Sequence, residues 1–446
     1  MSETSMERTR IRSRMVGRLR ASHEGCEVTL AGWVHRRRDL GGLLFVDLRD
    51  RSGLVQVSFG PDWTEKASLE CAHGLGHEDV IQVKGDVVLR PQGAQNPDMG
   101  TGEIEIHAKS VELFSNAQTP VIPVYRGPED ELPTEELRLK HRVLDLRRSE
   151  IQDALVLRHE LVLATRNYLD ACGFMEVETP ILTKATPEGA RDYLVPSRVH
   201  HGEFYALPQS PQIYKQILMV SGFDRYFQIA RCFRDEDLRS DRQPEFTQID
   251  VEASFIEPED IFSWIEGLMV CLANTAGIDI SQPFPRLTWA EAMERYGSDR
   301  PDLRYQLEIT DWTQATSSLG FNMIDSAVEE GARVRGLRLA GGAKLSRRQI
   351  ADIESKAKEA GAPGLLWAKQ AEGEASGPLG KFLAPDNSLA MGLSPGDIAF
   401  VAFGPDSLTS PVLDAVRSES IEALELTPQQ EHSWLWVTDF PVFDLS

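Results

Sequence analysis

A charged stretch near the middle of the chain holds residue types that could bind a phosphate-bearing ligand. The segment FRDEDLRSDRQPEFTQID, residues 233–250, lies between apolar sequences that are typical of strands. Its first arginine, Arg234, is always charged, and a planar guanidinium fits a phosphate or a carboxylate. The acidic residues could bind an amine, and the ring of Phe246 could stack on a base. This combination favours phosphoryl or acyl-adenylate chemistry.

The spacing of these polar residues argues against an ordinary core face. If the segment forms two strands and a loop, Arg234 and Glu236 share one side of the first strand. Phe246, Gln248 and Asp250 then share one side of the return strand. Buried polar groups need partners, so such a surface suits a ligand better than a core. The alternative is an exposed hairpin tied by salt bridges, each of which contributes about 0–1 kcal/mol.

Two other stretches carry polar residues that could join the same site. In ALPQSPQIYKQ, Ser210, Gln212 and Lys215 follow a proline turn, and Lys215 lies within one helical turn of Gln212. The loop TKATPEGARDYLVP is rich in charge, glycine and proline and contains Glu188, which suits a lid. The sequence contains no GxxxxGK[ST], GxGxxG or HExxH motif. A nucleotide site would therefore need another architecture than a P-loop or a Rossmann fold.

The bulk composition predicts a multidomain protein of the reducing cytoplasm. A chain of 446 residues is too long for one core, and 41% hydrophobic with 26% charged residues is typical of soluble globular proteins. The sequence contains no run of 18 or more apolar residues, so it does not predict a membrane span. The five cysteines are far apart and form no CxxC pair, so neither a disulfide framework nor a zinc site is indicated.

The charge distribution leaves room for a nucleic-acid partner despite a net charge of −22, because such binding follows local charge. Arginines cluster between Arg8 and Arg20 and again at Arg36, Arg37 and Arg38. Either cluster could be a solvated face. The second one stands in residues 27–114, where four or five strand-like segments and one helix predict an OB-type barrel. With Phe45 close behind, the arginines favour single-stranded RNA over a purely structural barrel.

The rest of the chain alternates between clear elements and connectors. Residues 115–136 read as a proline-rich acidic linker, and 151–174 as an amphipathic helix with Ile151, Leu155, Val162, Leu169 and Cys172 near one face. FMEVETPIL predicts a strand at a sheet margin because Pro180 interrupts it. From about Tyr296 a separate α+β domain is expected. The chain ends on the apolar strand-like segment HSWLWVTDFPVFDLS, and few folds end on a buried strand.

Five stretches, in order, resemble the bacterial type of aspartyl-tRNA synthetase, a class II aminoacyl-tRNA synthetase. FRDEDLRSDRQPEFTQID resembles motif 2, GFMEVETPIL resembles motif 1, and TKATPEGARDYLVPSRVH and LPQSPQIYKQ resemble the flipping loop and the aspartate-binding stretch. GWVHRRRDLGGLLFVDLRDRSG resembles the anticodon-binding OB domain. The resemblance runs from about residue 15 to the end. It implies a multidomain α+β fold with an OB domain at 1–118, an antiparallel-sheet catalytic domain at 119–296, an insertion domain at 297–432, and a returning catalytic segment at 433–446.

The resemblance also implies a role for each matching residue. Those that would bind aspartate are Glu188, Ser210, Gln212, Lys215, Arg234 and Asp250, with the Lys215 ammonium on the substrate side-chain carboxylate. Those that would bind ATP are Arg234, Asp235, Glu236, Gln243, Phe246 and Gln248, with Arg234 on the α-phosphate as the catalytic residue. Those that would bind tRNA are Arg36, Arg38, Leu40, Phe45, Gln56, Gly93 and Glu103. Leu40 resembles relatives that charge only tRNA-Asp, whereas Gly93 resembles relatives that also charge tRNA-Asn, so the two positions point to different tRNA ranges.

The implied function is an aspartate–tRNA ligase that uses ATP with Mg²⁺, is cytoplasmic, and dimerises through motif 1 without a membrane partner. The family continues beyond WVTDFPVF with a further ATP-binding motif that has no matching position here. We therefore expect that the 446-residue chain alone does not form aspartyl-adenylate, which ATP–pyrophosphate exchange at a normal rate would refute. The alternative is a catalytically inactive tRNA-binding fragment. An asparaginyl- or lysyl-type ligase is disfavoured, because the insertion domain and the sequence FRDEDLR resemble the bacterial aspartyl form.

Overall fold

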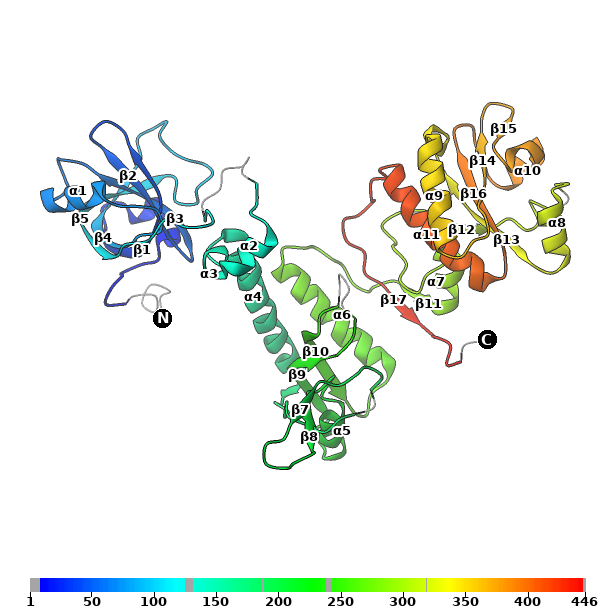
Figure 1. Ribbon diagram of the computed structural model, residues 1–446, viewed down its shortest axis with the longest axis horizontal. Helices are drawn as coiled ribbons and strands as arrows, with labels where there is room; N and C mark the ends of the chain where they lie inside the picture. The colour runs from blue at the N-terminus through cyan, green and yellow to red at the C-terminus, as the bar shows by residue number, and fades with distance from the viewer. Residues whose placement is uncertain (1–8, 125–130, 187, 238–241, 318, 444–446) are drawn as a thin grey trace. The chain divides into compact units, whose positions relative to one another are not determined.

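The computed structural model describes residues 9–124, 131–186, 188–237, 242–317 and 319–443 (Figure 1). The chain divides into two compact units between Leu163 and Ala164. Several predictions fall partly outside the described residues. They concern Arg8 in the first arginine cluster, the middle of the linker at 125–130, position 187 in the predicted lid loop, the tip of the charged hairpin at 238–241, and 444–446 in the returning segment.

The first unit contains the predicted barrel. Its five strands close in the order β1-β2-β3-β5-β4, and one helix follows β3. The elements are β1 (Glu27–Asp39), β2 (Leu44–Asp50), β3 (Gly53–Phe59), α1 (Lys66–His73), β4 (Val80–Leu89) and β5 (Ile104–Ser115). Short 3₁₀ turns, η2 (Val16–Arg18) and η3 (Ala21–His23), precede the barrel.

Alternation along the strands separates a dry interior from a polar outer face. Val46, Leu48 and Val57 point into the core and are fully buried. Their strand neighbours Asp47 and Gln56 therefore point outward, because successive side chains of a strand face opposite ways. The predicted OB-type barrel and its interposed helix are confirmed in this unit.

Three helices follow the barrel: α2 (Glu135–Lys140), α3 (Arg142–Asp145) and α4 (Ser149–Ala171). The prediction of a long helix is right, and the chain turns at Gly173, whose φ of 79° is accessible to glycine without strain. The predicted apolar face behaves differently along its length. Leu169 is buried, whereas Leu155 is 53% exposed. The amino-terminal part of that face is thus not covered by the described chain.

The second unit begins with a three-stranded sheet in the order β10-β9-β6. β9 (Arg225–Phe233) and β10 (Glu245–Ala253) pair antiparallel over nine residues each, as predicted for the charged hairpin. The predicted strand at FMEVETPIL is much shorter, because β6 is only Met175–Glu176. It lies at the sheet margin, as expected, where it pairs in parallel with β9.

Four further elements surround the sheet. They are the hairpin strands β7 (Leu194–Pro196) and β8 (Phe204–Ala206), and the helices α5 (Gln212–Val220) and α6 (Pro258–Thr275). α5 contacts both β9 and β10. The helix therefore brings its own polar residues to the charged hairpin.

A second, five-stranded sheet follows, in the order β12-β13-β16-β14-β15. Its elements are β12 (Ile309–Asp311), α8 (Asn322–Glu329), β13 (Arg333–Leu339), η4 (Gly342–Lys344), α9 (Arg347–Glu359), β14 (Leu366–Gln370), β15 (Ala375–Ser376), η5 (Gly380–Phe382), α10 (Pro385–Ala390), β16 (Ile398–Gly404) and α11 (Asp406–Ala423). The sheet and its helices have two apolar cores of their own. This agrees with the separate α+β domain expected after Tyr296.

The chain then returns to an earlier segment. β17 (Trp436–Thr438) pairs in parallel with β11 (Arg286–Thr288), which precedes α7 (Trp289–Tyr296) and the five-stranded sheet. Trp436 also donates to the Glu266 carboxylate on α6 at 2.9 Å. The division at 297–432 and 433–446 stays a prediction, and this pairing is the feature that supports it.

A fully buried arginine joins the five-stranded sheet to α7. Arg335 on β13 donates to the backbone carbonyls of Met293 and Glu294 at 3.0 and 2.7 Å. It also donates to the Ser410 hydroxyl on α11 at 2.8 Å. Free carbonyls at a helix carboxyl end are good partners for a cation, so this contact fixes α7 on the sheet. Within the described part of the chain, no helix is both long and apolar enough to cross a membrane.

Candidate substrate and RNA-binding sites

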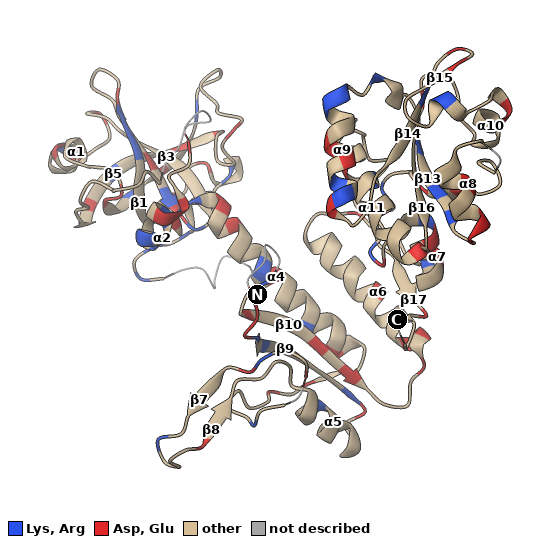
Figure 2. Ribbon diagram, turned by 45° about the vertical axis from the view of Figure 1, so that its right-hand side comes forward, with Lys and Arg blue, Asp and Glu red and all other residues tan. Residues whose placement is uncertain are grey.

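The floor of the candidate substrate site is the β9–β10 hairpin. Asp250 pairs with Gln228, Gln248 with Ala230 and Phe246 with Cys232 in the antiparallel register. The three β10 residues therefore share one face of the sheet, as predicted from their spacing. Arg234 and Glu236 lie just beyond the end of β9. In the ribbon of Figure 2 the acidic positions of β10 are coloured red.

A buried ion pair links α5 to this floor. Lys215 Nζ lies 2.8 Å from Asp250 Oδ1 and 3.4 Å from Glu252 Oε2. Lys215 is 9% exposed and Asp250 8%, so water screens the pair poorly. Burial alone would lower the pKa of Lys215, but the hydrogen bond that Lys215 donates to Asp250 and the charges of Asp250 and Glu252 outweigh it and raise that pKa. The lysine is therefore a stable ammonium at neutral pH.

Two polar atoms of this floor lack a partner among the described residues. Asp250 Oδ2 and Arg234 Nε are both buried, and neither makes a hydrogen bond there. The nearby Tyr226 hydroxyl donates to Gln228 Oε1 at 2.9 Å. Burial of an unpaired polar atom is costly, so such atoms are typical of sites that a ligand completes.

Arg234 lies over the ring of Phe246, with the guanidinium carbon 5.1 Å from the ring centroid. This cation–π contact contributes about 0.5–2 kcal/mol and orients the guanidinium. The sequence-based role of Phe246 was to stack on adenine. Since one face of the ring faces Arg234, a base would stack on the opposite face.

Cys232 lies among the predicted residues but was missed in the sequence. Its thiol is buried and donates to Gln248 Oε1 at 3.3 Å. Burial, followed by the Asp250 charge, raises the pKa of Cys232 to about 11, while Arg234 acts in the opposite direction. Glu188 and Lys215 also act on this thiol. Charges from four separate stretches of the chain therefore act on this one thiol of β9.

The loop that carries Glu188 is placed beside the start of α5. Ser210 donates to Glu188 Oε2 at 3.0 Å, and Gln212 is the first residue of α5. The structure thus brings Glu188, Ser210 and Lys215 to one neighbourhood. Gln209 was missed, although it stands within the quoted motif. No periodicity in the sequence indicates that this side chain is buried.

The residues predicted for ATP are less tightly arranged. The Asp235 backbone N–H donates to the Arg191 carbonyl at 3.0 Å, and Glu236 lies 3.7 Å from Arg242. Gln243 is exposed. These residues flank the undescribed hairpin tip at 238–241, so their ATP contacts stay predictions.

On the barrel, a network of polar side chains covers the outer face of β1, β2, β3 and β5. Arg38 donates to Asp47 at 2.7 Å and to Gln56 at 3.1 Å. Gln56 in turn donates to Glu105 at 2.7 Å. The buried Asp47 carboxyl has a raised pKa because burial outweighs the nearby Arg38. In the ribbon of Figure 2 the Lys and Arg positions of the barrel strands are coloured blue.

The other residues predicted for tRNA are distributed unevenly. Phe45 pairs with Arg38 and Ser58 in the register and shares their row, and Arg36 pairs with Asp47. By contrast, Leu40, Gly93 and Glu103 are exposed. The carboxylate that contacts Gln56 belongs to Glu105, which was missed. It could have been found from the buried neighbours Ile104 and Ile106, because alternation turns the residue between them outward.

A large cavity of about 830 Å³ opens on this face of the first unit. Among its lining residues are the arginines Arg36, Arg38, Arg49, Arg51, Arg90 and Arg147. A polar cavity with so many guanidinium groups suits an anionic ligand such as a nucleic-acid backbone.

A second buried ion pair, between Arg49 on β2 and Glu78 just before β4, stabilises the barrel. Arg49 donates two parallel hydrogen bonds of 2.7 Å to Glu78, and Arg147 adds a third of 2.7 Å. Burial favours the neutral acid, but the hydrogen bonds from the arginines, Arg49 first, outweigh it and lower the pKa of Glu78. Beside them, burial and the Arg49 charge lower the pKa of His35 to about 4. No local pattern indicates this cluster, because its members are far apart in the chain.

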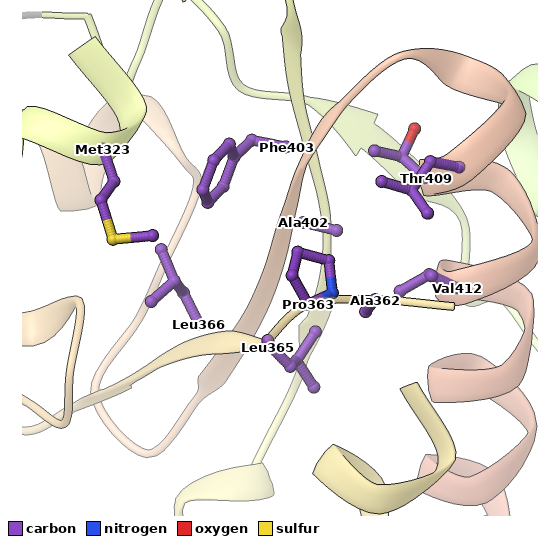
Figure 3. A pocket seen from close by; sticks show the side chains of 11 residues that line it. Met323, Ala362, Pro363, Leu365, Leu366, Ala402, Phe403, Thr409 and Val412 are labelled. Atoms are coloured by element: carbon purple, nitrogen blue, oxygen red, sulfur yellow. The ribbon is translucent and has the colours of Figure 1, made fainter. Parts of the chain in front are cut away.

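The five-stranded sheet holds a small apolar cavity of about 140 Å³ (Figure 3). Met323, Leu365, Leu366 and Phe403 contribute side chains, and Thr409 contributes a hydroxyl. A lining with so few polar groups does not fit a zwitterion or a nucleotide. Within the described residues, no three His, Cys, Asp or Glu side chains form a group that could hold a metal ion.

An OB-type barrel with a basic outer face and an antiparallel hairpin with a buried lysine and carboxylate together define a nucleic-acid-binding protein with a small-molecule site. Residues 28–114 match the family of the OB-fold nucleic acid binding domain. Residues 134–444, more than half of the chain, match the family of tRNA synthetases class II (D, K and N). The chain belongs to these class II tRNA synthetases.

Relatives and solved structures agree with this membership. Two proteins named aspartate–tRNA(Asp/Asn) ligase, from Bacillus cereus and Bacillus cytotoxicus, are each 47% identical over 439 residues, which cover 97% of this chain and 74% of the relative. The asparaginyl-tRNA synthetase of Pyrococcus horikoshii, solved with asparaginyl-adenylate, matches with a TM-score of 0.55 at 19% identity. That match covers 95% of this chain and 99% of the other. At this identity the likeness concerns the fold alone.

Proposed function

We propose that the protein is an aspartate–tRNA ligase, which activates aspartate with ATP and transfers it to the 3′ end of tRNA. The observation that carries the substrate choice is the Lys215–Asp250 pair with its unpartnered Asp250 Oδ2. A zwitterionic amino acid with an acidic side chain offers a group for each of these positions. The names of the Bacillus relatives support the same substrate.

The proposed pose assigns the three charged groups of aspartate to three residues. The substrate ammonium lies against Asp250 Oδ2, which gains the missing hydrogen bond. The side-chain carboxylate lies against Lys215, whose ammonium has three N–H donors and two acceptors already beside it. The α-carboxylate lies against Arg234, whose planar guanidinium accommodates it and the α-phosphate in turn.

Catalysis in this proposal needs no protein nucleophile. The α-carboxylate of aspartate attacks the α-phosphate of ATP, pyrophosphate leaves, and aspartyl-adenylate forms. Arg234 offsets the charge that develops on the phosphate, and the Phe246 ring holds it in place. The Mg²⁺ enters as a complex with the substrate ATP. A tRNA 3′ hydroxyl then attacks the activated carbonyl, and AMP leaves.

The tRNA range proposed is tRNA-Asp together with tRNA-Asn, as in the names of the Bacillus relatives. Gly93 supports this range, whereas Leu40 resembles the narrower one. Both residues are exposed on the barrel unit, so they are accessible to RNA. Charging assays with the two purified transcripts test the proposal, and charging of tRNA-Asp alone would contradict it.

We further propose a cytoplasmic homodimer. The apolar side chains of Leu155, Val156 and Leu163 on α4 are each about half exposed. Large exposed apolar surface is typical of an interface. Sedimentation of the protein is expected to give a dimer, and a Leu155→Asp variant a monomer. A monomer in the unmodified protein would contradict the proposal.

A second candidate function is tRNA binding without activation, which the basic cavity of the barrel favours. Two assays separate the candidates. The ligase predicts aspartate-dependent ATP–pyrophosphate exchange together with tRNA retention in filter binding, and exchange at a normal rate would also refute the sequence-based expectation that the 446-residue chain alone forms no aspartyl-adenylate. Retention of tRNA without any exchange would support the second candidate.

A further inference from the structure

Gln209 is a buried polar residue that the proposed function does not use. It directly precedes Ser210 in the chain and is 1% exposed. A buried carboxamide needs partners for its oxygen and for its N–H groups. In this protein all of these partners lie on the neighbouring loop.

The side chain of Gln209 pairs with one loop residue as a backbone would. Its Oε1 accepts from the Ala190 N–H at 3.2 Å, and its Nε2 donates to the Ala190 carbonyl at 3.0 Å. The same Nε2 donates to Asp192 Oδ1 at 2.5 Å. Only a carboxamide can both accept from an N–H and donate to a carbonyl and a carboxylate in this way.

The segment 190–192 is held from a second side as well. The Arg191 carbonyl accepts from the Asp235 N–H at 3.0 Å, next to Arg234. Asp192 Oδ2 also accepts from the Thr186 N–H at 3.2 Å, which closes the loop around Glu188. The segment therefore joins the start of α5 to the end of β9. These are the two elements from which the proposed aspartate and ATP contacts come.

We propose that Gln209 is a positioning residue for aspartate binding. It holds segment 190–192 in place, and this keeps Glu188 against Ser210 at the site. Gln209 makes no contact with the substrate in this proposal and acts through the loop. The inference rests on the proposed function, because it assumes that aspartate is the ligand of that site.

The test uses the Gln209→Glu variant of the full chain. This change keeps the shape, removes both N–H donors and places a second carboxylate beside Asp192. Hydrogen exchange of the 190–192 amides is expected to accelerate at least about tenfold, and the Kd for aspartate to rise roughly tenfold to a hundredfold. The matched control is Gln216→Glu on the exposed side of α5, which should change neither quantity.

A rescue separates positioning from a merely structural effect. In Gln209→Glu with Asp192→Asn, the new amide at position 192 can donate to the new carboxylate, so exchange and Kd should move back toward the original values. If Gln209→Glu does not fold, Asp192→Ala at a partly exposed position removes one contact and should show the same two changes in milder form.

Two results would overturn the inference. One is unchanged exchange of the 190–192 amides in the folded variants. The other is faster exchange with an unchanged Kd for aspartate, which would show that the position of the loop does not affect aspartate binding. Failure of the proposed function is recognised separately, because the unmodified protein would then not bind aspartate at all.

Discussion

At the residue scale, burial decides which side chains can react. Cys232 lies under the charged floor, and its pKa is raised to about 11, chiefly by burial. Cys26, by contrast, is exposed. Two thiols of the same chain are therefore expected to differ strongly in reactivity, since only the thiolate is a good nucleophile.

The first prediction concerns alkylation by iodoacetamide at pH 8. About a thousandth of Cys232 is thiolate at that pH, so it should stay unmodified while Cys26 is modified fully. Peptide mass spectrometry measures both sites, and denaturation before labelling is the control that should make them equal. Labelling of Cys232 at the rate of Cys26 in the folded protein would contradict this prediction and show that the Cys232 thiol is accessible.

The sequence predicted which residues lie at the site better than it predicted which of them contact one another. The alternation of Phe246, Gln248 and Asp250 follows from strand geometry, so their common face was predictable. The pairing of Lys215 with Asp250 joins a helix to a strand 35 residues away. No local pattern contains such a distance. Cys232 and Gln209 were missed for the same reason, whereas Glu105 was predictable from the alternation with Ile104 and Ile106.

At the scale of elements, strand β1 contains a histidine, His35, whose protonation couples the stability of the barrel to pH. His35 lies at the irregularity between Val34 and Arg36, and its ring Nδ1 accepts a hydrogen bond from Arg49 at 2.9 Å. Burial and Arg49 lower its pKa from 6.5 to about 4. The unfolded chain therefore binds more protons than the folded barrel between these two values.

The second prediction follows from this difference. The contribution of His35 to stability is complete above about pH 6.5 and is lost progressively as the pH falls toward 4. A His35→Asn variant keeps an acceptor for Arg49 without a titrating group, so its barrel should lose less stability over that range. Hydrogen exchange of the β1 and β4 amides at pH 7 and pH 4.5 measures this. An equal loss in both proteins would contradict the assignment.

Elements with strong local signals were predictable, and short ones were not. The helix expected at 151–174 is α4, because its apolar spacing extends over many turns. The strand expected at FMEVETPIL is reduced to Met175–Glu176, because backbone pairing depends on a neighbouring strand and not on propensity. The exposed Leu155 shows the same limit, since amphipathicity does not reveal what covers a face.

At the scale of the whole molecule, a chain with a net charge of −22 is proposed to bind a polyanion. The arginine-lined cavity of the barrel makes this possible, because binding depends on the local field. Its outward arginines were visible in the sequence. Their gathering around one cavity required the closed barrel.

The third prediction concerns the salt dependence of tRNA binding. The logarithm of the association constant should fall linearly with the logarithm of salt concentration, and Arg36→Gln should reduce the slope by about one. Arg348→Gln on the exposed face of α9 is the matched control and should leave the slope unchanged. Filter binding at several salt concentrations measures both. If both variants have the same slope as the unmodified protein, Arg36 does not contact the tRNA backbone.

The most direct test of the account compares aspartate and asparagine binding to the unmodified protein and to Lys215→Met by calorimetry. The unmodified protein should prefer aspartate by at least about tenfold, because a hydrogen bond to a charged group contributes roughly 1.5–3 kcal/mol. The variant should lose this preference while it keeps its affinity for ATP. A folded Lys215→Met protein with the original preference for aspartate would contradict the proposed site.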